Sequence, residues 1–152
     1  MNHGGKTNSL TAPSAQAQEK LIISAVNDAG VNPQTIRYIE AHGTGTALGD
    51  PIEINGLQSA FQKMDLKRHN NSKLKAYCGI GSVKTNIGHL EAVAGLAGLV
   101  KSVFSLKNKK IPSSIHCKEI NPFIDLNNSQ FYLVNETKNL DRLIDEGERK
   151  SH

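Results

Sequence analysis

YIEAHGTGTALGDPIE (residues 38–53) contains the end of a predicted strand, a glycine-rich loop and the start of a predicted helix. Residues 36–41, which follow a turn at Asn32-Pro33, are interpreted as a buried strand. The loop from His42 to Gly49 follows directly. Three signals then mark a helix that runs to about Met64: an N-cap at Asp50, Pro51 at the first helical position, and Glu53 closing a capping box. This stretch therefore predicts a strand, a loop at its carboxyl end and a helix.

A second unit of the same design follows further along the chain. It consists of a predicted strand at 76–82, a loop at 83–88 and a long helix at 89–106. The other expected segments are a helix capped by Ser14 and Gly30, a polar excursion at 65–75 and a short strand at 131–134. Because strands and helices alternate, the sequence predicts an α/β fold with a mixed sheet packed against helices.

Each of the two units presents a histidine where its strand ends, namely His42 and His89. In α/β folds, ligands and catalytic groups collect at the carboxyl ends of the strands. His89 is expected to open a helix, where the positive end of the macrodipole disfavours an imidazolium ion. A neutral imidazole can donate a hydrogen bond to a developing oxyanion. Either histidine alone could equally be a hydrogen-bonded turn residue.

Composition narrows the class of protein. The 152 residues include 38% hydrophobic residues, and no apolar stretch is long enough to cross a bilayer. No secretory signal opens the chain, and Cys78 and Cys117 have neither disulfide-framework nor metal-ligand spacing. We therefore expect a cytoplasmic protein with no metal and no membrane contact.

Charge is the other compositional signal. The net charge of +4 could favour acidic partners, but the basic residues are dispersed and aromatic residues make up only 5%. A solvated basic surface is the better interpretation, so we expect no nucleic-acid partner.

Two motifs together resemble those of a known family. Residues 38–53 resemble the first histidine motif of the ketosynthases (β-ketoacyl synthases) of modular bacterial polyketide synthases, and GSVKTNIGHLEA (residues 81–92) resembles the second. The resemblance covers residues 1–135 and implies the C-terminal half of the thiolase fold, a homodimer in the intact enzyme. Residues 136–152 form a polar tail unlike the family.

The resemblance also implies a reaction, the decarboxylative Claisen condensation of a malonyl-type extender with an acyl thioester. His42 and His89 would stabilise the enolate oxygen, and Lys84 would support them electrostatically with Glu91 as an ion-pair partner. Thr44, Thr46 and Thr11 would contact phosphopantetheine. No cofactor would be bound directly, because the substrates arrive on the phosphopantetheine arm of an acyl carrier protein.

The family's nucleophilic cysteine and its closing glycine-rich loop have no counterpart in this sequence. Cys78, inside a predicted strand, and Cys117, in a loop, are expected to be inert. The chain is therefore predicted to be inactive by itself and to need an N-terminal ketosynthase half. Two alternatives stay open: a non-catalytic remnant that binds carrier protein, and a phosphate-binding loop at Gly43–Gly49, although the Gly-Lys-Ser/Thr of a P-loop is missing.

Overall fold

A three-stranded parallel sheet lies at the centre of the computed structural model, which describes residues 14–66, 76–117 and 119–141. The middle strand, β2 (Cys78–Gly81), pairs with β1 (Tyr38–Glu40) on one side and with β4 (Phe131–Leu133) on the other. A separate antiparallel pair joins β3 (Lys110–Ile111) to β5 (Lys138–Asn139). The predicted α/β class is thus confirmed, while the antiparallel pairing expected of a mixed sheet occurs outside the parallel sheet.

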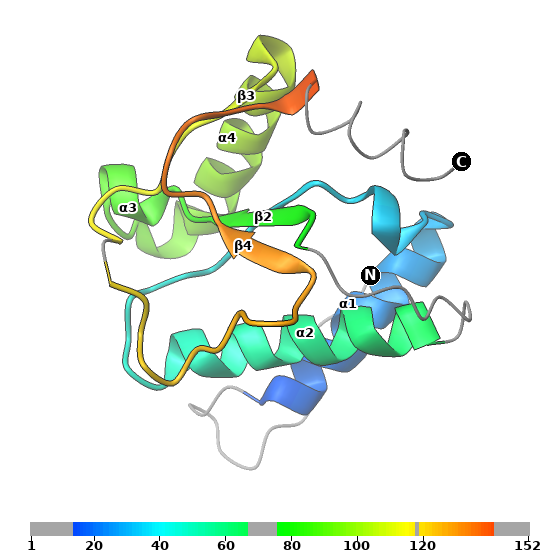
Figure 1. Cartoon of the computed structure of the whole chain (residues 1–152). Coiled ribbons are helices and arrows are strands. Elements are labelled where there is room, and N and C mark those ends of the chain that lie inside the picture. Colours follow the sequence, from blue (N-terminus) through cyan, green and yellow to red (C-terminus); the bar gives the residue numbers. More distant parts are fainter. Residues whose placement is uncertain (1–13, 67–75, 118, 142–152) are drawn as a thin grey trace.

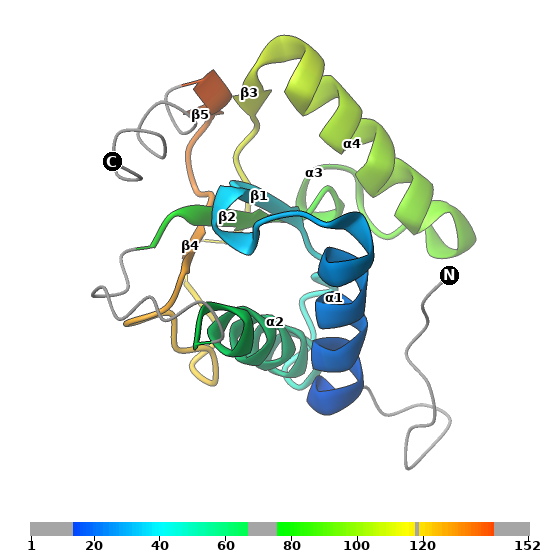
Figure 2. The same ribbon diagram turned by 90° about the vertical axis from the view of Figure 1, so that its right-hand side faces the viewer.

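Helices cover both faces of this sheet. The helical elements are α1 (Ala15–Ala29), η1 (Pro33–Thr35), α2 (Gly49–Leu66), α3 (Lys84–Ile87), η2 (Glu91–Val93) and α4 (Ala94–Asn108). α1 and α2 pack together on one side of the sheet, and α4 lies on the other, as Figures 1 and 2 show from two directions. The chain therefore has three layers, helix on sheet on helix.

α1 has the two caps that the sequence predicts. The Ser14 hydroxyl accepts a hydrogen bond from the backbone N–H of Ala17 at 3.3 Å. At the other end Gly30 adopts a left-handed conformation with φ 62°, and its N–H bonds back to the last turn. Both are local interactions, which explains why the sequence located this helix well.

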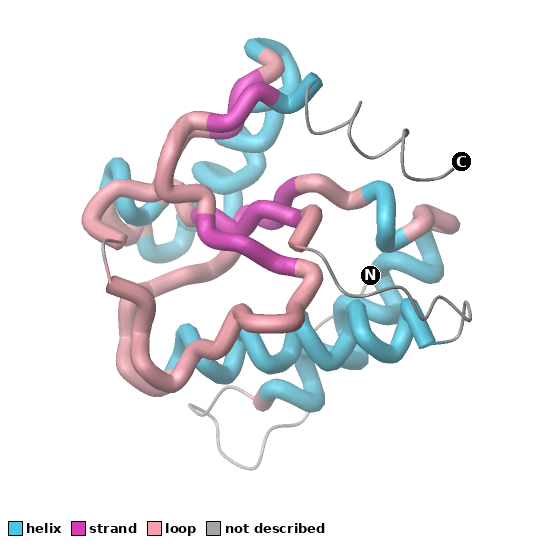
Figure 3. Tube along the Cα trace, in the orientation of Figure 1, coloured by secondary structure: helices cyan, strands magenta, loops and turns pink. Residues whose placement is uncertain are grey.

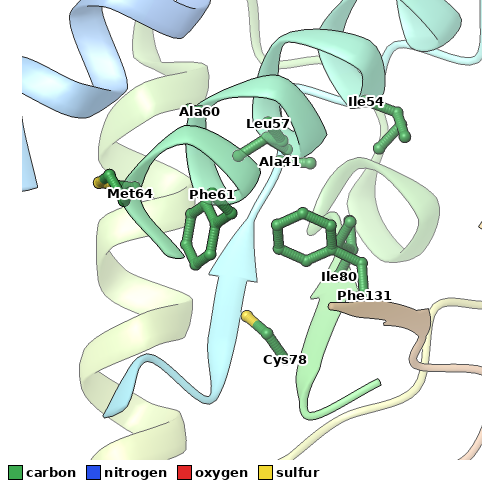
Figure 4. Packing of buried hydrophobic residues seen from close by; sticks show 9 residues of the cluster. All are labelled: Ala41, Ile54, Leu57, Ala60, Phe61, Met64, Cys78, Ile80 and Phe131. Atoms are coloured by element: carbon green, nitrogen blue, oxygen red, sulfur yellow. The ribbon is translucent and has the colours of Figure 1, made fainter. Parts of the chain in front are cut away.

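The larger core lies between α2 and the sheet. Side chains alternate along a strand, so Cys78 and Ile80 of β2 point toward α2. Phe61 of α2 meets Phe131 of β4 edge to face, with ring centroids 4.9 Å apart. Figure 4 shows this cluster, whose members are Ala41, Ile54, Leu57, Ala60, Phe61, Met64, Cys78, Ile80 and Phe131.

Glycines occupy the opposite face of β2, because larger side chains from neighbouring segments fill that space. A methyl group on Gly79 would lie 2.6 Å from a methyl of Val134, and one on Gly81 would lie 2.7 Å from the Tyr38 hydroxyl. Val134, Ile111 and Leu140 form a second, smaller core cluster, against which Tyr38 packs. The two-residue alternation of β2 therefore separates an apolar core from a face that accommodates Tyr38.

The expected loop at 83–88 and helix at 89–106 differ from the structure. Lys84–Ile87 forms one turn of α-helix, α3, which Gly88 ends with φ 77°. The next regular helix, α4, starts only at Ala94, after the turn η2. The reason is local geometry: Glu91 has φ 50°, a left-handed conformation that a continuous α-helix cannot contain.

The chain beyond residue 135 contributes to the described fold. β5 lies within the segment expected to be a polar tail, and it pairs with β3. Leu140 is buried in the second core cluster. The described part of that segment, up to Asp141, is therefore packed against the rest of the domain.

Candidate active site at the ends of two strands

His42 and His89 lie together, although they are 47 positions apart in the sequence. Their ring centroids are 5.6 Å apart and the rings are nearly perpendicular, with an interplanar angle of 88°. His42 follows the end of β1 and His89 follows α3, which begins just after β2. Because β1 and β2 are parallel neighbours, their carboxyl ends deliver both segments to one edge of the sheet, the edge beside α3 in Figure 3.

The backbone of the His42 loop is held by a carboxylate. Glu53 on α2 accepts the N–H of His42 at 2.7 Å on one oxygen and the N–H of Gly43 at 2.9 Å on the other. The sequence predicted Glu53 only as a capping-box residue of its own helix. That interpretation was wrong, because the loop folds back over the start of α2 and its amides take the carboxylate.

Asp50 also differs from its expected role as N-cap. Its carboxylate accepts the N–H of Gly45 at 3.1 Å, within the same loop. The hydroxyl of Thr46 instead accepts the N–H of Gly49, the first residue of α2, at 3.1 Å. Two acidic residues in the first turns of α2, Asp50 and Glu53, thus fix the loop that carries His42, and Thr46 supplies the cap.

The two histidine-bearing segments touch at Gly43 and Ser82. Gly43 has φ 46°, and a methyl group built there would lie 2.9 Å from Cβ of Ser82. The Ser82 hydroxyl donates a hydrogen bond to the carbonyl of His42 at 3.4 Å. Only glycine satisfies both the left-handed backbone and the close approach, so this position determines how near the loops can lie.

The ring of His89 has a defined tautomer. Its Nδ1 accepts the backbone N–H of Glu91 at 2.9 Å, so Nδ1 carries the lone pair. A neutral ring must then carry its proton on Nε2, which becomes a hydrogen-bond donor. The sequence predicted a neutral His89 from a helix N-terminus, but α4 begins five residues later. That helix-dipole argument therefore does not apply to His89, and the Glu91 N–H fixes the orientation of the ring instead.

Lys84 and Glu91 are not paired in the structure. Lys84 is the first residue of α3 and is half-buried, whereas Glu91 is exposed. Among residues 14–66, 76–117 and 119–141, no ion pair includes Lys84. The structure therefore does not contain the predicted ion pair between Lys84 and Glu91, and the Glu91 side chain faces solvent.

The threonines predicted to contact phosphopantetheine lie in the His42 loop. The hydroxyls of Thr44 and Thr46 are 3.4 Å apart. Thr44 is half-buried and Thr46 is exposed. Thr11 lies outside the described residues. The binding role of these threonines remains a prediction.

The sequence did not predict a buried ion pair that lies next to the histidine-bearing segments. Glu40, the last residue of β1, pairs with Lys101 of α4 at 2.9 Å. The signal was available, because Glu40 interrupts an apolar strand and Lys101 is the charged residue within the apolar stretch 92–106. Charged residues in such stretches are seldom buried unless they are paired.

The two cysteines differ in their environment. Cys78 is fully buried, and burial raises the pKa of its thiol from 9.0 to about 12. Cys117 is partly exposed, and burial, with a smaller contribution from Asp50, raises the pKa of its thiol. Neither thiol is activated. In the described part of the chain, no group of three or more His, Cys, Asp or Glu residues could hold a metal ion.

We expect alkylation at pH 8 to modify Cys117 and to leave Cys78 unmodified in the folded chain. A pKa of about 12 lowers the thiolate fraction of Cys78 about a thousandfold relative to an ordinary thiol, because each pKa unit is a factor of ten. Mass spectrometry after iodoacetamide treatment measures both sites, with the urea-unfolded chain as the control in which both react. Equal labelling of the two cysteines in the folded chain would contradict this assignment.

Comparison with known proteins shows that the chain is similar to β-ketoacyl synthases of polyketide synthases. The family profile "Beta-ketoacyl synthase, C-terminal domain" matches residues 1–118. The chain is 54% identical over 138 residues to polyketide synthase PksN of Bacillus subtilis (strain 168), which covers 91% of this chain and 2% of that protein. It is 43% identical over 149 residues to polyketide synthase ThaG of Burkholderia thailandensis, covering 98% of this chain and 2% of that protein.

Solved structures agree with this likeness. Ketosynthase twelve of the bacillaene polyketide synthase of Bacillus amyloliquefaciens superposes with a TM-score of 0.81 at 41% identity, covering 92% of this chain and 24% of that one. The ketosynthase from module 1 of the bacillaene synthase of B. amyloliquefaciens FZB42 gives a TM-score of 0.81 at 45% identity, covering 92% and 25%. The chain thus spans about a quarter of these structures. In its described residues, no helix has the length and apolar character needed to cross a membrane.

Proposed function

This chain belongs to the β-ketoacyl synthase C-terminal domain family, and we propose that it supplies the two histidines of a polyketide-synthase ketosynthase. The observation that carries the proposal is the pairing of His42 and His89, with ring centroids 5.6 Å apart at one sheet edge. The reaction proposed is decarboxylative condensation of a malonyl-type extender, carried on the phosphopantetheine of an acyl carrier protein, with an acyl thioester.

The chemistry of this pair suits an enolate. When the extender loses carbon dioxide, its carbon–carbon bond breaks and the electron pair moves toward the thioester carbonyl oxygen. The Nε2–H of His89 would donate a hydrogen bond to that oxygen, and the ring of His42 would lie on its other side. Preorganised donors of this kind act on charge that develops in the transition state.

The second step, the condensation, needs a nucleophilic cysteine from a partner polypeptide. The carbanion attacks an acyl group held on a cysteine thioester, forms the new carbon–carbon bond and releases the thiolate. Cys78 and Cys117 are unsuited to carry that acyl group, since burial raises the pKa of both thiols. We therefore assign the nucleophile to an N-terminal ketosynthase half.

An exposed apolar stripe on α4 fits such a partner. It consists of Leu96, Leu99, Val100, Val103 and Phe104, which recur at helical spacing. α4 packs on the sheet through its other face, where Ala94, Gly98, Lys101 and Ser105 are buried. A contiguous apolar patch of this kind marks an interaction surface, and the solved ketosynthases are about four times longer than the part matched here.

Replacing Leu99 with aspartate should weaken association with the N-terminal half by a hundredfold or more. An unpaired carboxylate buried at an interface costs several kcal/mol, and about 2.8 kcal/mol is already a factor of one hundred. Leu66→Asp is the matched control, because Leu66 is 62% exposed, against 61% for Leu99, but lies at the end of α2. Isothermal titration of the two halves measures the difference. Equal affinities for the two variants would exclude α4 as the contact.

The proposal is tested by reconstitution. We mix this chain with the N-terminal half of a bacterial ketosynthase and supply malonyl and acyl carrier proteins. Carbon dioxide release and β-ketoacyl product are expected from the mixture and from neither half alone. A well-folded complex that produces neither would refute the proposal. If titration shows binding of acylated carrier protein to such an inactive complex, the chain acts instead as a carrier-binding remnant.

A further inference from the structure

The carboxylate of Glu40 connects three segments of the fold. One oxygen accepts the hydroxyl hydrogen of Tyr38 at 2.6 Å and pairs with the ammonium group of Lys101 at 2.9 Å. The other oxygen accepts the backbone N–H of Val83. Lys101 also donates to the Tyr38 hydroxyl at 2.8 Å. One side chain thus joins β1, the segment that follows β2, and α4.

This junction is buried and closely fitted. The side chains of Glu40 and Lys101 are 13% and 7% exposed. A methyl group at Gly98 of α4 would lie 3.0 Å from Cγ of Glu40, so glycine at this position makes room for the carboxylate. A buried ion pair contributes little net stability compared with an apolar pair of the same shape. The role of the Glu40–Lys101 pair is therefore better explained by the segments that it orients.

The segments that Glu40 connects are those that carry the two histidines. Glu40 lies two residues before His42 on the same strand end. Val83 directly precedes α3, a single helical turn that leads through Gly88 to His89. A displacement of Val83 relative to Glu40 would therefore move the start of the short segment that carries His89.

We propose that Glu40 is a positioning residue that sets the separation of the His42 and His89 rings by accepting the Val83 N–H, with Lys101 and Tyr38 holding its carboxylate. This inference rests on the proposed function for its catalytic meaning, but its geometric part can be measured independently. Glu40 acts through the two histidines and contacts no substrate in this scheme.

One pair of variants separates the acceptor from the charge. E40Q/K101M removes both charges but keeps an amide oxygen that can accept the Val83 N–H. E40M/K101M has the same unbranched length and lacks that acceptor. Neither leaves an unpaired charge in the interior. We expect the nuclear Overhauser cross-peak between the His42 and His89 rings, observed on the histidine-labelled 152-residue chain, to persist in E40Q/K101M and to be lost in E40M/K101M.

A second pair keeps every charge and hydrogen-bonding group. G98A places a methyl group against Glu40, whereas G95A adds one on the same helix where no atom lies within 4 Å. Both substitutions favour the helical state, so both chains should fold. We expect G95A to retain the ring cross-peak of the unmodified chain and G98A, which must displace Glu40 by a few tenths of an ångström, to weaken it. Circular dichroism verifies folding in all four variants. If E40M/K101M does not fold, the comparison of G98A with G95A tests whether Glu40 positions the two rings.

A ring cross-peak of unchanged intensity in both E40M/K101M and G98A would overturn the proposal. Its loss in E40Q/K101M would also do so, since the acceptor for Val83 is present there. In the reconstituted ketosynthase, decarboxylation by E40M/K101M should fall about a hundredfold, as expected for a misplacement of about 1 Å. If the unmodified complex is inactive, the proposed function fails, and the cross-peaks still decide whether Glu40 positions the rings.

Discussion

Alanine at His42 or at His89 is expected to lower the decarboxylation rate of the reconstituted ketosynthase by about two to three orders of magnitude. Loss of one preorganised donor to a developing oxyanion has an effect of this size. Because both rings face the same oxygen in the proposed reaction, the double variant should lose less than the product of the two single losses. Carbon dioxide release from malonyl carrier protein is the measurement.

Two further variants sharpen this test. His116→Ala removes an exposed histidine from the loop after β3 and should leave the rate unchanged. His89→Gln places an amide N–H near the position of Nε2 and should recover part of the rate lost in His89→Ala. A folded complex of the His89→Ala variant that decarboxylates at the unmodified rate would contradict the role assigned to the pair.

Alanine at Phe61 is expected to lower the free energy of unfolding by about 3–5 kcal/mol. Phe61 is 1% exposed and contacts Phe131 with ring centroids 4.9 Å apart. The substitution removes buried apolar area, leaves a cavity between α2 and the sheet, and eliminates the aromatic pair, which contributes about 0.5–1.5 kcal/mol. A typical domain has only about 5–15 kcal/mol in total, so the substitution should remove a large fraction of the stability of the fold.

Urea unfolding followed by circular dichroism measures this loss, and Phe123→Ala is the matched control. Phe123 is 74% exposed, so its replacement should change the free energy of unfolding by less than about 0.5 kcal/mol. Phe61→Leu, which retains most of the buried volume, should fall between the two. Similar unfolding midpoints for Phe61→Ala and Phe123→Ala would show that the core between α2 and the sheet does not dominate stability.

The site depends on that core for its geometry. α2 carries Phe61 into the core and also Glu53, whose carboxylate holds the amides of His42 and Gly43. Stability and positioning of the His42 loop are therefore coupled through one helix. Variants of Glu53 and of Phe61 should be compared at equal fractions of folded protein, so that loss of loop geometry is distinguished from loss of fold.

Local features of the sequence determined much of this protein. The caps of α1 at Ser14 and Gly30, the placement of β1 and β2, and a histidine after each strand all follow from patterns within a few residues. These predictions succeeded because caps, turns and apolar periodicity are short-range interactions. The convergence of His42 and His89 also followed, since parallel neighbouring strands end at one edge of a sheet.

Tertiary contacts decided the rest. Glu53 serves the His42 loop instead of its own helix, because the loop folds back onto α2. One local feature was also missed: the helix expected from His89 starts at Ala94, because the Glu91 N–H bonds to the ring of His89 and φ of Glu91 is positive. Glu40 and Lys101 are 61 positions apart, and only the packing of α4 across β1 brings their charges together. The contacts of Glu53 with the His42 loop and of Glu40 with Lys101 join residues from different elements of the chain, so no local pattern of residue types specifies them.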